Sequence, residues 1–483
     1  MKSNAGMENN YDAVIIGAGI GGLICGNYLA QNGMKTLIVE QHFQPGGCCT
    51  SFKRKGFTFD AGGHFVGGLR ENGSMRKILE GLDIDCNKIF TKLDPADFLI
   101  FPDFSVKICG DENIILDQIT ELFPHQAGAA KKFFEEINSF NYTKSYLYKD
   151  MTFMDVLNRY FEDEKLKAVF DILVMYIGLV SNKVSAVAAI ILFREFILDG
   201  GYYPKGGMQS LADTLAEKFQ GFGGELLLSS KAEKITLSGK KCSGIVLEDG
   251  REIRCKYVIS NIDAHKTFVE MVGKEHISEE LLAKLNQLEL SVSHFVVYLG
   301  INSKASDKLM QRCNTWYIPG YDIRKIYNEM LEDPLKSNGF VHAAFPSFYD
   351  NELSPKGCES IFLTVLAPFK TLEFWKEAKE KLASVLIGRA ENIMEGLSES
   401  IVLKEYSTPQ TILRYTGNSD GANYGWSMIP SQSGRLRLKQ ETEIDGLYLA
   451  GHWTQPGCGI ATVAQSGFSA ARMVLLKNRV FNI

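Results

Sequence analysis

The sequence predicts an α/β chain with a doubly wound parallel sheet and a second, discontinuous α+β unit. Three observations support this prediction. An apolar strand, a glycine-rich turn and a helix open the chain between residues 11 and 40, and a similar strand, glycine loop and helix close it between 447 and 477. Between these ends, residues 92–198 form a long, apolar and mainly helical stretch. Alternation of strands with helices is typical of parallel sheets.

The first element is a βαβ unit. Residues 11–16 form an apolar strand, residues 22–31 a helix that ends at Gly33, and residues 35–40 a second strand. The short loops and the spacing of about 30 residues match the start of a doubly wound sheet.

The turn of this unit carries a dinucleotide fingerprint. Gly17-Ala18-Gly19-Ile20-Gly21-Gly22 fits Gly-x-Gly-x-x-Gly directly after a strand. Gly17 permits the tight turn, Gly19 lets the backbone approach a pyrophosphate, and Gly22 lets helix and strand pack closely. Glu40 follows at the end of the second strand, where a carboxylate binds a ribose diol. An acid at this position argues against a 2′-phosphate and therefore against NADP.

The middle of the chain mixes both element types. We expect the apolar segment 161–180 to be helical; after a glycine turn at 204–207, a second helix begins at Met208 and carries apolar side chains on one face. We expect strands at 226–228, 233–237, 242–247, 252–255, 257–260, 295–299 and 361–365, a hairpin at 249–250, and a helix over 372–394.

The end of the chain repeats the opening pattern. Residues 447–450 form a strand, residues 451–459 a glycine-containing loop, and residues 460–477 a helix. A second strand–loop–helix is what an extended cofactor needs for its ribityl chain and flavin ring, so these features favour FAD over NAD.

Composition excludes several classes of protein. The 483 residues are 45% hydrophobic and 23% charged, typical of folded globular chains, and the net charge of −5 gives no footprint for nucleic acid. The ten cysteines form no Cys-x-x-Cys and the eight histidines are scattered, so no metal site is expected. Because no secretion signal is visible, the ten cysteines predict reduced thiols and a cytoplasmic location. The apolar segment 168–193 is interrupted by polar residues, so we expect contact with a membrane surface at most.

Taken together, the motifs resemble one family of flavoproteins. Four motifs carry the resemblance: Pro45-Gly-Gly-Cys-Cys-Thr-Ser-Phe52, Gly56-Phe-Thr-Phe-Asp-Ala-Gly-Gly-His64, Tyr202-Tyr-Pro-Lys-Gly-Gly207 and Gly446-Leu-Tyr-Leu-Ala-Gly-His-Trp453. This set is similar to the phytoene desaturase, carotenoid isomerase and retinol saturase group of amine-oxidase-like FAD proteins. The resemblance implies a Rossmann-type FAD-binding domain of residues 1–91, 200–290 and 405–483, and a hydrophobic substrate-binding domain of residues 92–199 and 291–404.

The resemblance also implies which residues hold a non-covalent FAD. Gly17, Gly19, Gly22 and Glu40 are expected at the ADP half, Gly46 and Gly47 beside the ribityl chain and ring, and Ala232 against the adenine. Gly451, Gly459 and Ile460 are expected at the pyrophosphate and the flavin edge. His452 departs from the pattern, because many FAD enzymes carry an acidic residue there.

Candidate reactive residues cluster around the expected ring position. They are His64, Tyr424, Trp426 and His452, each of which could instead pack or make a structural hydrogen bond. A covalent flavin link through Cys458 is not expected. The apolar segment 168–198 could line a tunnel for a polyene or form an ordinary buried helix pair, because both use the same residue types.

The expected function is FAD-dependent oxidation of carbon–carbon bonds in an apolar conjugated isoprenoid, as in carotenoid-precursor desaturases, with hydride transfer to flavin N5. The alternatives are a redox-neutral carotenoid cis-trans isomerase, a retinol-saturase-like reductase and a polyene-tailoring enzyme, followed by an amine oxidase or a flavin-free escort of prenylated proteins. No second dinucleotide fingerprint follows a strand. The partners are therefore a hydrophobic small molecule and an external electron acceptor (oxygen, a quinone or a protein) or donor.

Overall fold

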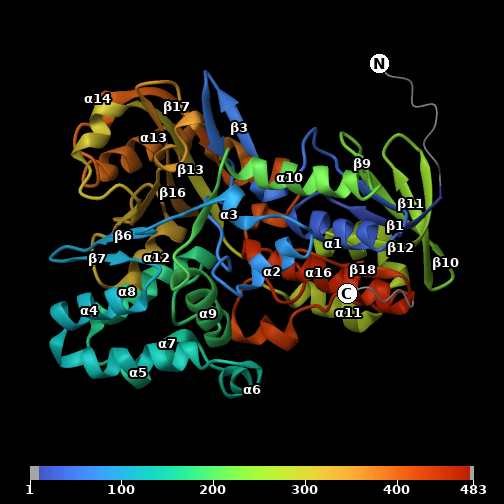
Figure 1. The fold of residues 1–483 in the computed structure, drawn as a ribbon, viewed down its shortest axis with the longest axis horizontal. Helices are drawn as coiled ribbons and strands as arrows, with labels where there is room; N and C mark the ends of the chain where they lie inside the picture. Colours follow the sequence, from blue (N-terminus) through green and yellow to red (C-terminus); the bar gives the residue numbers. More distant parts are fainter. Residues whose placement is uncertain (1–9, 479–483) are drawn as a thin grey trace.

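Two large β-sheets organise the chain in a computed structural model that describes residues 10–478. The first sheet contains, in spatial order, β10 (Ala232–Ser238), β11 (Lys241–Leu247), β12 (Glu252–Ser260), β1 (Asn10–Ile16), β2 (Thr36–Val39) and β9 (Glu225–Leu227), with β18 (Leu447–Leu449) also paired to β12. The second contains β17 (Ile401–Ser407), β13 (Ser293–Asn302), β16 (Cys358–Ala367), β15 (Val341–Ala344), β14 (Asn314–Tyr317), β6 (Asp97–Ile100) and β7 (Ser105–Ile108). In Figure 1 the first sheet lies on the right and the second on the upper left.

Strand β1 is apolar throughout because both faces of the first sheet are covered. Ala13 and Ile15 pack in one hydrophobic cluster, whereas Val14 and Ile16 pack in another on the opposite face. The first cluster is closed by α1 (Ile20–Gln31), α2 (Ser74–Glu80), α10 (Met208–Gly221) and α16 (Ile460–Lys477). The second is closed by the π-helix Lys266–Gly273 and by α11 (Glu279–Gln287).

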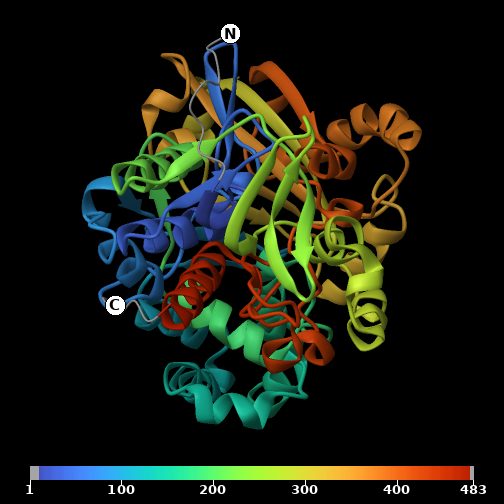
Figure 2. The same cartoon turned by 90° about the vertical axis from the view of Figure 1, so that its right-hand side faces the viewer.

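The first sheet is parallel at its centre and antiparallel at one edge. Strands β12, β1, β2, β9 and β18 run parallel, and β10, β11 and β12 run antiparallel. The two strands expected at 252–255 and 257–260 are one continuous strand, β12. Figure 2 looks onto this side of the molecule, with β10 to β12 in yellow-green and α16 in red. The predicted α/β fold with a Rossmann-type core is confirmed.

The second sheet separates a large helical core from a small aromatic one. On β13, Phe295 and Val297 face the helical core, and Val296 and Tyr298 face the hairpin of β3 (Ser51–Arg54) and β4 (Phe57–Asp60). The helical core is built mainly from α4 (Glu112–Leu122), α5 (Ala127–Asn138), α7 (Phe153–Tyr160), α8 (Glu164–Leu173), α9 (Ala186–Leu192), α12 (Ile323–Glu332) and α13 (Leu372–Ala390). The remaining elements are α3 (Cys86–Ile89), α6 (Tyr142–Ser145), α14 (Leu397–Ser400), α15 (Pro409–Thr416), β5 (Phe90–Lys92) and β8 (Tyr202–Pro204).

The helical stretch is more broken than the apolar pattern predicted. A continuous helix over 161–180 is wrong: α8 begins only after Asp163, whose carboxylate accepts hydrogen bonds from the backbone N–H groups of Lys165 and Leu166. A 3₁₀ turn then ends at Gly178, in the left-handed conformation at φ +72°. Strands β6 and β7 also lie inside the stretch. They were not predicted, because a short apolar run is compatible with either a strand or a helix.

The predicted boundaries of the two domains stay a prediction, and residues 1–9 and 479–483 of the expected FAD-binding domain lie outside the described residues. Within residues 10–478, no helix is both long enough and apolar enough to span a bilayer. The apolar segment 168–193 is largely buried in the helical core and presents little surface.

Candidate active site

One cavity of about 800 Å³ runs between the two sheets. At one end it is lined by the glycine turn after β1, by Glu40 and by Ala232. At the other end its wall is apolar and aromatic, and includes Tyr176, Ile191, Phe196, Trp316, Phe340 and Phe362. A concave, mostly apolar site with a few polar groups is the usual form of a cofactor and substrate pocket.

The glycine turn forms a cradle that a side chain would fill. Gly17 has φ +96°, and a Cβ on Gly22 would lie 2.1 Å from the carbonyl oxygen of Gly17. Gly19 is the N-cap of α1, so the first N–H groups of this helix open toward the cavity. Unpaired N–H groups and the helix dipole suit a pyrophosphate, so the turn fits the dinucleotide that its sequence predicted.

Glu40 lies directly after β2, at the carboxyl end of the parallel strands. Its carboxylate accepts hydrogen bonds from the backbone N–H groups of Ala18 at 2.7 Å and His42 at 2.8 Å. These bonds hold the side chain at the cavity wall, where Ala232 at the start of β10 also lies. The two residues expected at the ribose and the adenine are therefore brought to the same end of the cavity.

Asn261 joins the two glycine loops, and the sequence analysis missed it. Its Nδ2 donates to the carbonyl of Gly17 at 3.3 Å, and its Oδ1 is buried without a hydrogen-bond partner. A Cβ on Gly21 or Gly451 would lie 2.6 or 2.7 Å from this Oδ1. Its position directly after a parallel strand is the clue that could have identified it.

The remaining predicted cofactor residues line the same cavity. Gly46 and Gly47, at φ +127° and +60°, follow Glu40, and the N–H of Gly46 donates to the carbonyl of Ala18 at 2.8 Å. From the other end of the chain come Gly451, Gly459 (the N-cap of α16) and Ile460 (its first residue). Loops separated by some 400 positions in sequence thus meet at one cavity.

Arg437 is a second residue that the sequence analysis missed. Its guanidinium is 1% exposed and donates to the backbone carbonyls of Trp426, His452 and Thr454. Burial lowers its pKa to about 10, so it stays charged at neutral pH. It ties the loop that carries Tyr424 to the loop that carries His452.

Three of the four predicted reactive residues line the cavity. They are His64, Tyr424 and His452. Burial lowers the pKa of His64 to about 4 and that of His452 to about 3, and it raises the pKa of Tyr424, so all three are uncharged at pH 7. The fourth, Trp426, is not among the described residues that line the cavity. It is buried and packs edge-on against Trp453, with ring centroids 4.8 Å apart.

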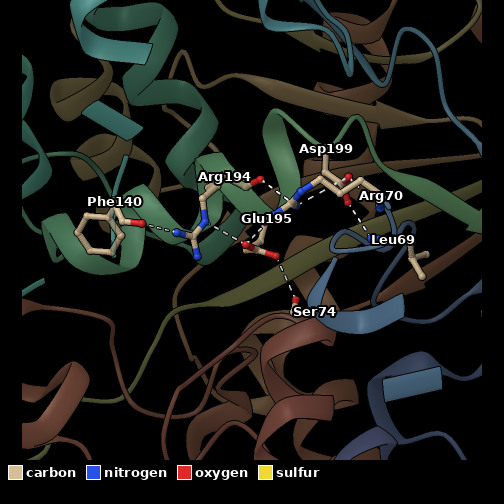
Figure 3. A network of polar contacts seen from close by, with 7 residues as sticks. All are labelled: Leu69, Arg70, Ser74, Phe140, Arg194, Glu195 and Asp199. Atoms are coloured by element: carbon tan, nitrogen blue, oxygen red, sulfur yellow. Dashed lines mark hydrogen bonds and ion pairs between the residues drawn. The ribbon is translucent and has the colours of Figure 1, made fainter. Parts of the chain in front are cut away.

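An ionic network anchors the cavity wall near Phe196. Figure 3 shows Glu195, in the π-helix Phe193–Ile197, between Arg70, Arg194 and Ser74, with the carboxylate accepting from both arginines at 2.9 and 3.0 Å. Asp199, fully buried at its side chain, accepts from the N–H groups of Leu69 and Arg70. The network holds the π-helix, and thus the wall residue Phe196, against the loop after His64. Such π-helical turns are frequent at functional sites.

The family model of the flavin-containing amine oxidoreductases matches residues 20–321, more than half of the chain. The chain belongs to the flavin-containing amine oxidoreductase family. It is an FAD-dependent oxidoreductase, as the sequence predicted, and the glycine cradle, Glu40 and Asn261 fit that cofactor.

Similar proteins support the group named from the motifs. A prolycopene isomerase of an Oncidium hybrid cultivar is 27% identical, covering 96% of this chain and 84% of that protein. A neurosporene-forming phytoene desaturase of Rhodobacter capsulatus is 26% identical, covering 98% and 95%. The amine-oxidase-like fold is shared with an oxidoreductase from Methanosarcina mazei (TM-score 0.69, 18% identity, 95% and 100% covered) and with cyclohexylamine oxidase from Brevibacterium oxydans (0.66, 14%, 97% and 99%).

Proposed function

We propose that this flavoprotein desaturates a long, apolar, conjugated isoprenoid, of the kind named in its desaturase relatives. The observation that carries the proposal is the continuity of the cavity. The same cavity is lined by a dinucleotide cradle, by an aromatic and aliphatic chamber, and by the uncharged side chains of His64, Tyr424 and His452. Such a chamber suits a hydrocarbon chain better than a charged or strongly hydrated substrate.

The predicted cofactor residues take the following proposed roles. Gly17, Gly19, Gly22 and Glu40 hold the ADP half, with Ala232 against the adenine. Gly46, Gly47, Gly451, Gly459 and Ile460 surround the ribityl chain and the ring. Asn261 joins this set, because its unpartnered Oδ1 lies where the two glycine loops meet.

The side chains of the chamber position the substrate and keep water out. The bound flavin supplies the hydride acceptor, N5, and the protein supplies orientation and a dry site. Tyr424 and His452 line the wall from the two loops that Arg437 ties together. We propose that these two residues and His64 orient the reacting carbons, whereas Trp426, which packs against Trp453, helps to hold the loops that carry them.

Isomerisation is the second candidate function. Prolycopene isomerases align over nearly the whole chain. A double bond can change geometry when a hydride leaves the substrate and later returns, with no net oxidation. This reaction would use the same cavity and would need no external electron acceptor.

A non-covalent cofactor is expected from the state of Cys458. This thiol lines the cavity, and burial raises its pKa to about 11. The thiolate is the nucleophilic form of cysteine, so the raised pKa disfavours attack by Cys458 on the flavin ring at neutral pH. Acid precipitation of the purified protein should release all of the flavin into the supernatant; yellow colour that stays in the pellet would contradict this expectation.

An anaerobic visible spectrum of the purified holoenzyme tests the proposed function. On addition of phytoene in detergent, we expect the flavin band to bleach as the substrate is oxidised. A band that persists with phytoene, while prolycopene is converted to its all-trans isomer, would replace desaturation by isomerisation. A persistent band with neither polyene converted would overturn both candidates.

The electron acceptor and any membrane contact also belong to this proposal. Oxygen, a quinone or a protein would reoxidise the flavin after each desaturation.

Among the described side chains, Tyr146 and Leu147 form an adjacent pair of strongly exposed apolar residues, at 63% and 72%. We propose that this pair contacts the lipid surface, and co-sedimentation with lipid vesicles should fall when both are replaced by serine.

A further inference from the structure

A buried carboxyl group lies directly behind the aromatic wall of the chamber. Asp97, on β6, is 1% exposed and accepts hydrogen bonds from the hydroxyl of Tyr176 at 2.5 Å and from Nε1 of Trp316 at 3.1 Å. Tyr176 and Trp316 both line the cavity, and Asp97 does not. Strand β14, which carries Trp316, pairs in parallel with β6, which carries Asp97. This pairing places the carboxylate behind the wall.

A histidine stands between this carboxyl group and the cavity. His342, on β15, lines the cavity and is 3% exposed. Its Nε2 lies 4.0 Å from Oδ1 of Asp97 and has no hydrogen-bond partner. Its ring lies 4.4 Å from that of Trp316 and 4.9 Å from that of His64, measured between centroids.

The surroundings leave this pair without other charges. The titratable groups that face Asp97 are Tyr176, Cys313, His342 and Tyr349, and burial raises the pKa of the tyrosines and of the thiol. Burial lowers the pKa of His342 well below its usual value and raises that of Asp97 to about 7. His64 and His294, which face His342, are also uncharged at pH 7, since burial lowers the pKa of each to about 4.

We propose that His342 accepts the proton that the substrate loses during desaturation, and that Asp97 is the positioning carboxylate that stabilises the resulting imidazolium. This inference rests on the proposed function. The bound flavin would be the oxidant and would accept a hydride from one carbon of the substrate. The neighbouring C–H bond then breaks, its electron pair forms the new double bond, and its proton bonds to a ring nitrogen of His342 before passing to solvent.

A weakly basic imidazole is sufficient for this step. Loss of hydride leaves a carbocation, whose adjacent C–H is a strong acid, so the base needs correct placement more than a high pKa. The imidazolium formed in a dry cavity needs a counter-ion, and Asp97 is the carboxylate within 4.0 Å of it. His64, although equally near the cavity, forms no comparable pair with a carboxylate among the described residues. Isomerisation by hydride departure and return would leave the pair without a role.

Single-turnover bleaching of the holoenzyme by phytoene, with two variants, tests the proposal. General-base catalysis typically contributes about 10²–10⁴-fold, so His342→Gln should lower the bleaching rate by about 100-fold or more. Asp97→Asn should lower it by about tenfold or more in the wild-type background and have little further effect in the His342→Gln background. The affinity for lycopene, measured by its absorption shift, should change less than about twofold in all variants, since neither residue is asked to bind the hydrocarbon.

The pH profile and isotope effects distinguish a proton acceptor from a packing residue. Only ionised Asp97 stabilises an imidazolium, so the wild-type rate should rise as pH increases through about 7, and Asp97→Asn should lose this rise. In His342→Gln the deuterium isotope effect should grow at the carbon that loses the proton. Asp171→Asn is the matched control: this carboxyl on α8 is buried outside the cavity, so the pH-dependent rise should remain.

Three results would overturn the assignment. They are a His342→Gln rate within about threefold of wild type, effects of the two substitutions that simply multiply, and a pH profile unchanged by Asp97→Asn. If phytoene bleaches the wild-type flavin but any of these results is found, the inference fails and the proposed desaturation stands. If no polyene bleaches the wild-type flavin, the proposed desaturation fails and the inference fails with it.

Discussion

Replacing Gly22 by alanine should weaken FAD binding by about 100-fold or more and leave the purified protein largely colourless. The added Cβ would lie 2.1 Å from the carbonyl oxygen of Gly17 and 3.2 Å from Cγ2 of Ile15. Both neighbours belong to β1 or the turn after it, which are fixed by pairing with β12 and β2. The turn must therefore move, and losing two hydrogen bonds to a charged phosphate costs about 3–6 kcal/mol.

The measurement is a fluorescence titration of the apoprotein with FAD, supported by the ratio of flavin to protein absorbance after purification. Gly388→Ala is the matched control, because Gly388 is exposed on α13 and a Cβ there would meet no atom within 4 Å. This change should leave FAD affinity unaltered and stabilise the helix by about 0.5–1 kcal/mol. A Gly22→Ala protein that binds FAD as tightly as wild type would show that the turn does not hold the pyrophosphate.

The sequence predicts the dinucleotide end of the cavity because the information there is local. The glycines from Gly17 to Gly22, the following helix and Glu40 lie within one βαβ unit, and each residue type answers a need of its own segment. The helix begins at Ile20, two residues earlier than expected, since Gly19 already serves as the N-cap. The closing strand and helix follow the same local rules.

The substrate end could not be predicted in the same way, because its polar residues meet only through long-range strand pairing. Asp97 and His342 are 245 positions apart in the sequence and come together because β6 pairs with β14, and β14 with β15. An isolated aspartate or histidine in an apolar strand has no spacing pattern that reveals its partner. Arg437 was missed for the same reason, since its contacts lie in other loops, whereas Asn261 had a local clue in its position directly after β12.

Substitution of Arg437 by methionine is expected to lower the free energy of unfolding by about 2–4 kcal/mol and to loosen FAD. Two effects oppose each other. Removing a buried charge recovers its desolvation cost, and the lowered pKa of about 10 corresponds to about 3 kcal/mol. Against this gain, the carbonyls of Trp426, His452 and Thr454 lose their donor, at about 1–3 kcal/mol each.

The balance favours destabilisation because the three carbonyls lie in two irregular loops and belong to no helix or strand that could supply another donor. Denaturant unfolding of the holoenzyme and of the FAD-free protein measures the effect, with Arg472→Met, exposed on α16, as the control. Lysine at 437 should restore only part of the loss, since one ammonium cannot match the fork of donors that a guanidinium offers to separate acceptors. Because these loops place Tyr424 and His452 on the cavity wall, FAD should dissociate faster from Arg437→Met even at pH values and temperatures where the protein stays folded. Unfolding and FAD release equal to those of wild type would mean that the loops hold their positions without the guanidinium.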